Sequence, residues 1–171
     1  LFLQQYGIST LFAVKIYKAY GDEAISKVKK NPYCLAKDIY GIGFFSADKI
    51  ALKMEIPPEG MERIQAGIQF VLGNARESGH CYLSKNQIIN QTKEILSLGR
   101  EELIEVEINN LLQNREISLR KIPSEDGLQD CYYACSLYYD ENFIADKVSL
   151  HSKMSSSLPL EKVKDWVKRY C

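Results

Sequence analysis

The sequence has no long apolar run and no excess charge of either sign. No stretch approaches the roughly 20 consecutive apolar residues of a membrane-spanning helix, and Leu1–Gln5 lack the basic start and apolar centre of a signal peptide. We therefore expect a soluble, cytoplasmic chain that has no membrane partner. The 22 basic and 22 acidic residues cancel, so any attraction to a polyanion must come from a local patch. An initiating Met is also missing, and we expect the chain to be part of a longer protein.

Residues that form disulfides or bind metals are few. The five cysteines are an odd number without a C-x-x-C pair, and there are only two histidines. We therefore expect no disulfide and no metal site. Cys131 and Cys135, the closest cysteine pair, lie in the apolar run CYYAC and are predicted to be buried free thiols.

Known catalytic patterns are also missing. The sequence holds neither a G-x-x-x-x-G-K-[ST] phosphate loop nor a G-x-S-x-G elbow. His80 and Cys81 are adjacent, and neighbouring residues of a strand point to opposite faces, which argues against a nucleophile pair. With 171 residues, of which 46% are hydrophobic, the chain can bury one core or two small ones. We expect a folded chain with no catalytic residues and no cofactor of its own.

One internal repeat is present. At an offset of 34 residues, YGISTLFAVKI from Tyr6 aligns with YGIGFFSADKI from Tyr40. The apolar spacing around each copy is helical, so each copy predicts a helix, a short turn and a second helix. Two copies are too few for a tetratricopeptide array. Between the copies, GDEAISKVKK predicts a further helix that Asp22 caps and Pro32 terminates.

The second copy carries the pattern most informative about function. GIGFFSADKIALKM, from Gly41 to Met54, has the hydrophobic-x-Gly-hydrophobic-Gly turn and following helix of a helix-hairpin-helix motif. Its glycines allow close approach to another backbone, and we expect Gly43 to require positive φ. The next helix would aim free N–H groups at a DNA phosphate without reading bases. The candidate DNA-binding residues of this copy are Gly41, Ile42, Gly43, Phe44, Ser46, Lys49 and Lys53.

The first copy has a weaker version of the same motif. Its candidates are Gly7, Ile8, Ser9 and Lys15, and Ser9 replaces the second glycine, so we expect a less close phosphate contact. Residues 1–60 hold eight lysines against six acidic residues, whereas residues 61–171 hold 14 basic against 16 acidic residues. The local charge favours DNA contact in the first part only modestly. A Gly-hydrophobic-Gly turn also joins helices that merely pack together, so a purely structural role stays open.

Beyond His80 the pattern changes. HCYL predicts a short strand, KNQIINQTKEILSL a helix that Ser84 caps and Gly99 closes, REELIEVEINNLLQN a second helix, and ISLRKI with QDCYYACS a β-hairpin. Together they predict a small winged-helix-like domain. The second helix carries four acidic residues that we expect to face solvent or a basic protein surface, and such a helix would not enter a DNA groove. These acids are Glu101, Glu102, Glu105 and Glu107, and the expected inner face is Leu103, Val106 or Ile108, Leu111 and Leu112.

Four segments of the sequence resemble the N-terminal region of RecD-like helicases, the exodeoxyribonuclease V alpha-subunit family. They are FLQQYGIST, AVKIYKAYGDEAI, NPYCLAKDIYGIGFFSADKIA and GHCYLSKNQI, and the resemblance is strongest over Phe2–Leu83. It implies a tandem helix-hairpin-helix region ahead of an ATP-dependent 5′–3′ DNA motor used in repair or recombination, with ATP and Mg²⁺ bound by a core outside this sequence. Phe45 departs from the basic or small residue that is frequent in the family after GIGF, which would weaken a phosphate contact there.

These observations predict a mainly α chain with a tandem helix-hairpin-helix domain followed by a winged-helix-like domain that contains a β-hairpin. The expected segments are residues 1–57 for the tandem domain, 58–79 for a connecting helix, 80–146 for the winged-helix-like domain and 147–171 for a helical tail leading to the helicase core. The predicted function is accessory, sequence-independent binding to the DNA phosphate backbone, with the helicase core of the same parent chain as the other partner. The alternative is a protein-docking module that positions the motor or a partner and never touches DNA.

Overall fold

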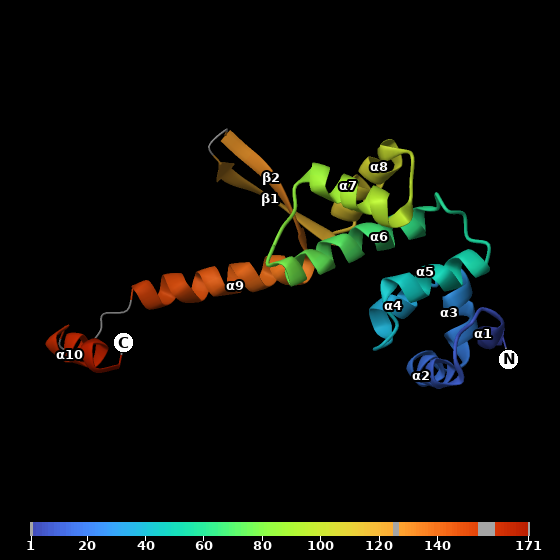
Figure 1. The fold of residues 1–171 in the computed structure, drawn as a ribbon, viewed down its shortest axis with the longest axis horizontal. Coiled ribbons are helices and arrows are strands. Elements are labelled where there is room, and N and C mark those ends of the chain that lie inside the picture. The colour runs from blue at the N-terminus through green and yellow to red at the C-terminus, as the bar shows by residue number, and fades with distance from the viewer. Residues whose placement is uncertain (1, 125–126, 154–159, 171) are drawn as a thin grey trace. The chain divides into compact units, whose positions relative to one another are not determined.

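The computed structural model describes residues 2–124, 127–153 and 160–170, and it confirms a mainly helical chain with an antiparallel hairpin (Figure 1). The chain divides into two units, Leu1–Cys135 and Ser136–Cys171. The helices of the first unit are α1 (Phe2–Gln5), α2 (Thr10–Tyr20), η1 (Gly21–Glu23), α3 (Ala24–Lys30), α4 (Cys34–Asp38), α5 (Phe44–Lys53), α6 (Met61–Asn74), η2 (Ala75–Ser78), α7 (Lys85–Leu96) and α8 (Glu101–Gln113). Its strands are β1 (Ile117–Ser124) and β2 (Gly127–Ala134).

The two repeat copies form two helical hairpins. The first is α1, a turn and α2, and the second is α4, a turn and α5, so the predicted helix, turn and helix is confirmed in both copies. Ile8 and Ile42, which occupy the same position of each turn, are both buried in the core. Each turn therefore anchors its hairpin by one aliphatic side chain, which leaves the neighbouring backbone at the surface.

The segment between the hairpins departs from the prediction at its start. Gly21, at a φ of 57°, ends α2 as glycine at a helix C-terminus commonly does. The short helix η1 follows, so α3 begins only at Ala24 and no side chain caps it. Asp22 therefore caps nothing, and its carboxylate instead accepts a hydrogen bond from the Tyr17 hydroxyl at 3.3 Å.

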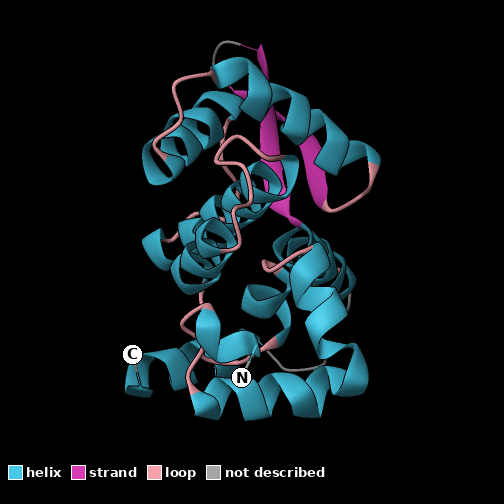
Figure 2. Ribbon diagram, turned by 90° about the vertical axis from the view of Figure 1, so that its right-hand side faces the viewer, coloured by secondary structure: helices cyan, strands magenta, loops and turns pink. Residues whose placement is uncertain are grey.

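The second half of the first unit contains the two expected helices and the hairpin (Figure 2), but the strand predicted over HCYL is only an isolated bridge. Leu83 forms an antiparallel bridge with Tyr132 of β2, and β1 pairs with β2 antiparallel from Ile117–Ala134 to Ser124–Gly127. The Ser84 hydroxyl accepts from the Gln87 N–H, and the Gln87 side chain accepts from the Ser84 N–H, which is a capping box at the start of α7.

Two details of α7 and α8 differ from the prediction. Helix α7 ends at Leu96 because Ser97, not Gly99, adopts the left-handed conformation, at a φ of 53°. On α8 the buried side chains are Ile104, Glu107, Ile108 and Leu111, whereas Val106 is 53% exposed. Of the two alternatives for the inner face, Ile108 is the correct one.

Helix α6 packs against both halves of the first unit and so does more than connect them. It contacts α5 on the hairpin side and α7, α8 and β2 on the other (Figure 1). Its buried face carries Ile64, Ile68, Val71 and Leu72, and Gly67 allows the Leu96 side chain to approach within van der Waals distance. The core is continuous from the hairpins through α6 to β2.

A buried ion pair links α5 to α6. Arg63 Nε lies 2.8 Å from Asp48 Oδ1, and Arg63 Nη2 lies 3.0 Å from Asp48 Oδ2, so the pair is bidentate. Arg63 Nη1 also donates to the carbonyl oxygens of Pro58 and Leu96, and the Tyr33 hydroxyl donates to Asp48 at 2.7 Å. These bonds join α4, α5, the loop before α6 and the end of α7 at one point.

The hydrogen bonds also determine how these groups titrate. Burial by itself would raise the pKa of Asp48, but the bonds from Arg63 and Tyr33 outweigh burial and hold that pKa below its usual value near 3.8. The bond to Asp48 raises the pKa of Arg63, and burial, with the same carboxylate, raises the pKa of Tyr33. All three groups therefore keep their ordinary charge state at neutral pH.

The second unit consists of most of α9 (Cys135–Ser152) and of α10 (Leu160–Tyr170). The expected boundary between residues 146 and 147 lies inside α9, because the helix continues without interruption from the end of β2. The predicted break at SSSLP lies outside the described residues. Among the helices of the described ranges, none is both long and apolar enough to cross a membrane.

The ion pair gives a prediction about stability. Asp48→Asn leaves the Arg63 guanidinium, whose side chain is 8% exposed, without a compensating charge. We expect a loss of about 3 kcal/mol in the free energy of unfolding, since removing one partner of a buried pair leaves the other uncompensated. Urea titration monitored by circular dichroism measures it. Glu23→Gln, which breaks the exposed Glu23–Lys27 pair, is the matched control and should cost less than about 1 kcal/mol.

The same variant predicts a pH dependence. A carboxylate whose pKa is lowered by folding adds stability that is complete above its unfolded pKa and is lost as the pH falls through its folded pKa. The difference in unfolding free energy between wild type and Asp48→Asn should therefore be constant near neutral pH and shrink as the pH falls below about 3.8. A difference that stays constant down to pH 2 would contradict the assigned role of the Asp48 charge.

Candidate nucleic-acid interface

The two hairpin turns repeat the same backbone conformation. Gly7 and Gly41, at equivalent positions, have φ values of +83° and +97°, a region that favours glycine. Ser9 and Gly43, two residues later, are both extended, with φ values of −65° and −86°, and both are N-caps of the following helix. The expectation that Gly43 needs positive φ is wrong. The first glycine of each motif has that requirement, and this explains why serine is accommodated at position 9.

A side chain from the second helix of the other copy lies beside each of these two exposed glycines. A Cβ added to Gly7 would lie 2.7 Å from the Lys53 ammonium of α5, and one added to Gly41 would lie 3.3 Å from the Phe12 ring of α2. Lys15 of α2 also donates to the Tyr40 carbonyl oxygen at 3.1 Å. Lys15, which we expected at the first hairpin, therefore lies at the second one. No spacing along the chain indicates this contact, because it joins residues of different repeat copies.

The two helix N-termini differ in how they are capped. The Ser9 hydroxyl accepts from the Phe12 N–H at 3.4 Å, which occupies one of the free donors of α2. Gly43 has no side chain, and no side-chain hydrogen bond caps α5. In α5 the Ser46 N–H, at the same position, donates instead to the Gly43 carbonyl oxygen at 3.1 Å. The N–H three residues after the N-cap is therefore occupied in both helices, and capping does not distinguish the two copies as phosphate sites.

A hollow between the first turn and α5 gathers most of the candidate residues. On α5, Ser46, Lys49 and Lys53 are exposed at intervals of three and four residues, so they lie along one face of the helix. The Gly7–Ser9 backbone forms the opposite wall. The residues that line this hollow are Tyr6, Gly7, Ile8, Ser9, Phe12, Ile42, Ser46, Lys49, Ile50, Leu52 and Lys53. The lining thus combines two lysines, two serines and a tyrosine with apolar side chains.

Three of the candidates are core residues. Ile8, Ile42 and Phe44 are all buried, and the Phe44 ring stacks on Phe70 with centroids 4.9 Å apart. Their side chains hold the turns in place, so only their backbone groups remain as possible phosphate contacts. Gly41 and Gly43 are exposed.

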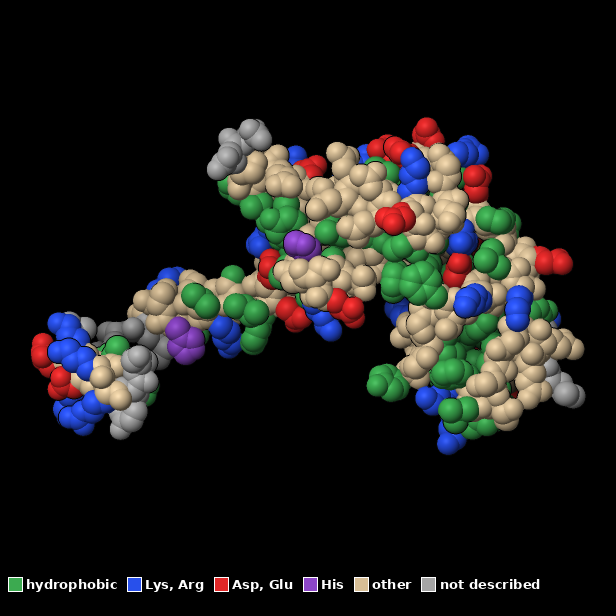
Figure 3. Space-filling view, viewed as in Figure 1, with side chains coloured by type: hydrophobic (Ala, Val, Ile, Leu, Met, Phe, Trp, Pro, Cys, Tyr) green, Lys and Arg blue, Asp and Glu red, His purple; other side chains and the backbone are tan. Residues whose placement is uncertain are grey.

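Phe45, at which we expected a weakened phosphate contact, packs against other rings. Its ring meets Phe44 edge-on at 5.5 Å and Phe70 of α6 edge-on at 5.2 Å, while 56% of the residue remains exposed. Hydrophobic side chains gather on this face around α4 and α5, with lysine and arginine side chains beside them (Figure 3). Phe45 therefore contributes to the contact between α5 and α6 and brings no positive charge to the turn.

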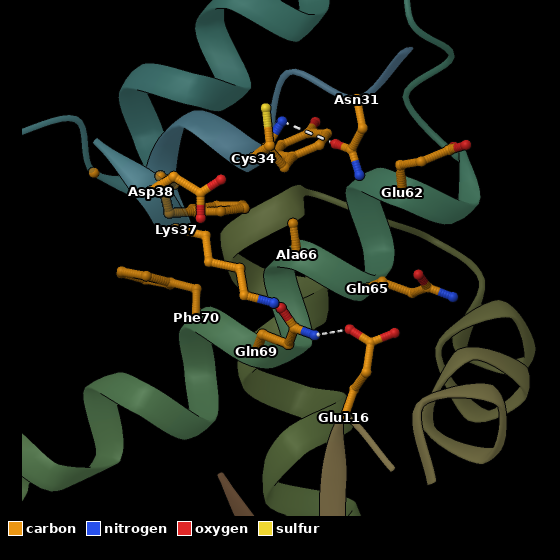
Figure 4. A pocket seen from close by; sticks show the side chains of 14 residues that line it. Asn31, Cys34, Lys37, Asp38, Glu62, Gln65, Ala66, Gln69, Phe70 and Glu116 are labelled. Carbon is orange, nitrogen blue, oxygen red and sulfur yellow. Dashed lines mark hydrogen bonds between the residues drawn. The ribbon is translucent and has the colours of Figure 1, made fainter. Parts of the chain in front are cut away.

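A second hollow, between α4 and α6, has a different chemistry. Lys37 and Asn31 of the hairpin side face Glu62 of α6 and Glu116 across it (Figure 4). The Gln69 side chain donates to Glu116 at 2.7 Å. Because this hollow carries three carboxylates, those of Asp38, Glu62 and Glu116, for the one ammonium of Lys37, it is less suited to a phosphate than the hollow beside α5.

The acidic helix α8 is largely neutralised from within the chain. Glu101 pairs with Lys93 and Glu105 with Lys85, and both lysines belong to α7. Glu107 was expected at the surface but is buried, and it accepts from Gln65 of α6 at 2.7 Å. This hydrogen bond therefore links α8 to α6. The sequence does not indicate it, because Glu107 stands among three other glutamates that are expected at the surface.

The cysteines and acids form no metal site in the described residues. No group of three or more His, Cys, Asp or Glu side chains is close enough to hold an ion across residues 2–124, 127–153 and 160–170. Cys131 is buried as expected, and burial raises the pKa of its thiol, whereas Cys135 is only half-buried. Among the described residues, Cys34, Cys81, Cys131 and Cys135 form no disulfide.

Two helical hairpins whose turns each contact the second helix of the other, with lysines on the helix after the second turn, define a tandem helix-hairpin-helix domain. Comparison with protein families agrees with this class: residues 1–82 match the family described as the ATP-dependent RecD2 DNA helicase HHH domain. This part of the chain is therefore a helix-hairpin-helix domain of the type found at the N-terminus of RecD-like helicases. The match includes α6 and η2, in agreement with the continuous core that joins them to the hairpins.

The glycine conformations give a prediction. Gly41→Ala introduces a Cβ at a φ of +97° and 3.3 Å from the Phe12 ring, so we expect a loss of about 1 kcal/mol or more in unfolding free energy. Gly43→Ala meets no atom within 4 Å at an ordinary φ, so we expect a smaller loss than for Gly41→Ala, arising only because alanine is a poorer N-cap than glycine. Urea unfolding of the two variants side by side measures the difference, and a larger loss for Gly43→Ala would overturn the assignment of the turn.

Proposed function

We propose that the hollow beside α5 binds the DNA phosphate backbone without reading base sequence, as the accessory DNA-binding region of a RecD-like, ATP-dependent 5′–3′ helicase of repair or recombination. One observation carries the proposal: Ser46, Lys49 and Lys53 lie along one exposed face of α5 and line the hollow opposite the first hairpin turn. Family membership of residues 1–82 supports the same role.

The chemistry of these groups favours phosphate over base edges. A lysine ammonium is a compact charge that attracts a phosphate oxygen from many directions, and the N–H groups at a helix start add a partial positive charge. The hollow contains no arginine, asparagine or glutamine side chain that would form a bidentate contact with a base edge. Binding should therefore depend on salt and only weakly on sequence.

The motor function belongs to another part of the parent protein. The sequence contains no phosphate loop, so we assign no residue here to ATP or Mg²⁺. Both would be bound by the helicase core, which moves along DNA while the present region holds the phosphate backbone. The core is accordingly the second proposed partner of this region.

A protein-docking role is the second candidate, and the face of α2 favours it. Leu11 and Val14 of α2 occupy the repeat positions of Phe45 and Asp48 of α5, which α6 covers through Phe70 and Arg63. Leu11, Val14 and the neighbouring Tyr17 are all exposed. The face that binds a helix in the second copy is therefore open in the first, where a helix of the motor or of another protein would pack.

Salt dependence distinguishes the two candidates. Lys49→Ala with Lys53→Ala should weaken binding equally for unrelated DNA sequences and lower the slope of log affinity against log salt by up to about 2, since each phosphate contact contributes about one unit. Fluorescence anisotropy of labelled oligonucleotides across a salt series measures both. Lys30→Ala with Lys37→Ala removes the same charge from exposed sites outside the hollow and is the control.

The control also separates the effect of the hollow beside α5 from the effect of positive charge elsewhere on the surface. We expect the control pair to change the slope by much less than the Lys49 and Lys53 pair, with unfolding free energies of both variants close to that of the wild type. An equal change for both pairs would mean that charge alone, and not the hollow, attracts DNA. A slope unchanged by Lys49→Ala with Lys53→Ala in a folded chain would support the docking role.

A further inference from the structure

Tyr40 projects from the tip of the second hairpin. It lies directly before Gly41 and is 94% exposed, more than any other large hydrophobic residue described. Its repeat counterpart Tyr6, before Gly7, is partly buried and packs against the core. At this exposure the Tyr40 ring contributes almost no buried area to folding. The same turn position thus serves packing in one copy and leaves an aromatic ring at the surface in the other.

The base of this ring is held in place by α2. Lys15 donates to the Tyr40 carbonyl oxygen at 3.1 Å, and its ammonium lies 5.8 Å from the centroid of the Tyr40 ring and 5.4 Å from that of Phe12. Phe12 itself covers Gly41, the next residue. The backbone that carries the ring is therefore fixed by two side chains of the other copy, and a positive charge lies beside the ring.

An exposed aromatic ring beside an ammonium group suits an unpaired nucleotide. Aromatic side chains stack on any nucleobase, because every base has a π-face, and a nearby cation attracts the attached phosphate. In duplex DNA both faces of a base are occupied by its neighbours, so the ring has nothing to stack on without disrupting the helix. In single-stranded DNA the faces are accessible.

We propose that Tyr40 is a base-stacking residue that gives the second hairpin a preference for single-stranded over duplex DNA. This inference rests on the proposed function, since it adds a base contact to the phosphate contacts of the hollow beside α5. Lys15 acts as its positioning residue, through the carbonyl bond and the charge beside the ring. The contact reads no sequence, because stacking discriminates little between bases.

The test compares three ligands with the 171-residue chain: an oligothymidine strand, the same sugar-phosphate backbone with abasic sites, and a duplex of equal length. Tyr40→Ala should weaken binding to oligothymidine by about tenfold, the loss of one stacked base, and change binding to the abasic strand and the duplex by less than about twofold. Tyr40→Phe keeps the ring and should retain wild-type affinity. The salt slope should not change, because no charge is removed.

A matched control and three outcomes decide the inference. Tyr139→Ala removes another exposed tyrosine ring, from α9, and should leave all three affinities unchanged. Equal weakening of all three ligands by Tyr40→Ala, or no weakening of oligothymidine, would overturn the stacking role while the proposed function stands. Failure of the wild-type chain to bind any of the three would overturn the proposed function itself and with it the inference, and would favour a protein partner for this tip.

Discussion

The bidentate pair between Asp48 and Arg63 is the interaction on which the arrangement of the first unit depends. It joins the helix that follows the second hairpin turn to α6, and Arg63 extends the link to two backbone carbonyls. A buried pair of this kind gains little net stability, because desolvation of the two charges offsets their attraction. Its effect is to specify one position of α5 relative to α6, because any other position leaves two charges buried and unpaired. Ser46, Lys49 and Lys53 are carried on the same helix and are positioned with it.

The helices and the hairpin were predictable because local signals decide them. Apolar periodicity located α2, α5, α6 and α8, and Ser84 and Gln87 at the start of α7 form a capping box whose partners are three residues apart. The prediction failed where the deciding partner is distant in sequence. Glu107 is buried because Gln65, 42 residues away, donates to it, and Lys15 reaches a carbonyl 25 residues away. No rule based on sequence spacing predicts contacts between residues this far apart in the chain.

The candidate site shows the same division. The positions of Ser46, Lys49 and Lys53 on one face followed from helical spacing, and the structure brings them together in a hollow. The sequence pattern did not predict which of the two glycines, Gly41 or Gly43, has positive φ, because a Gly-hydrophobic-Gly pattern is the same in either case. Comparison of the two copies contains the signal: serine stands at the second position in the first copy, and serine rarely adopts positive φ. Comparison of the two copies therefore identifies Gly7 and Gly41 as the turn residues with positive φ.

The contacts between the two turns limit how the repeat can change. A Cβ on Gly7 would meet the Lys53 side chain and one on Gly41 would meet the Phe12 ring, so the residue at each turn is restricted by a helix of the other copy. A substitution at either glycine therefore disturbs both hairpins. Positions without such a contact differ between the copies: serine or glycine stands at the N-cap, and the tyrosine before the turn glycine is packed in one copy and exposed in the other.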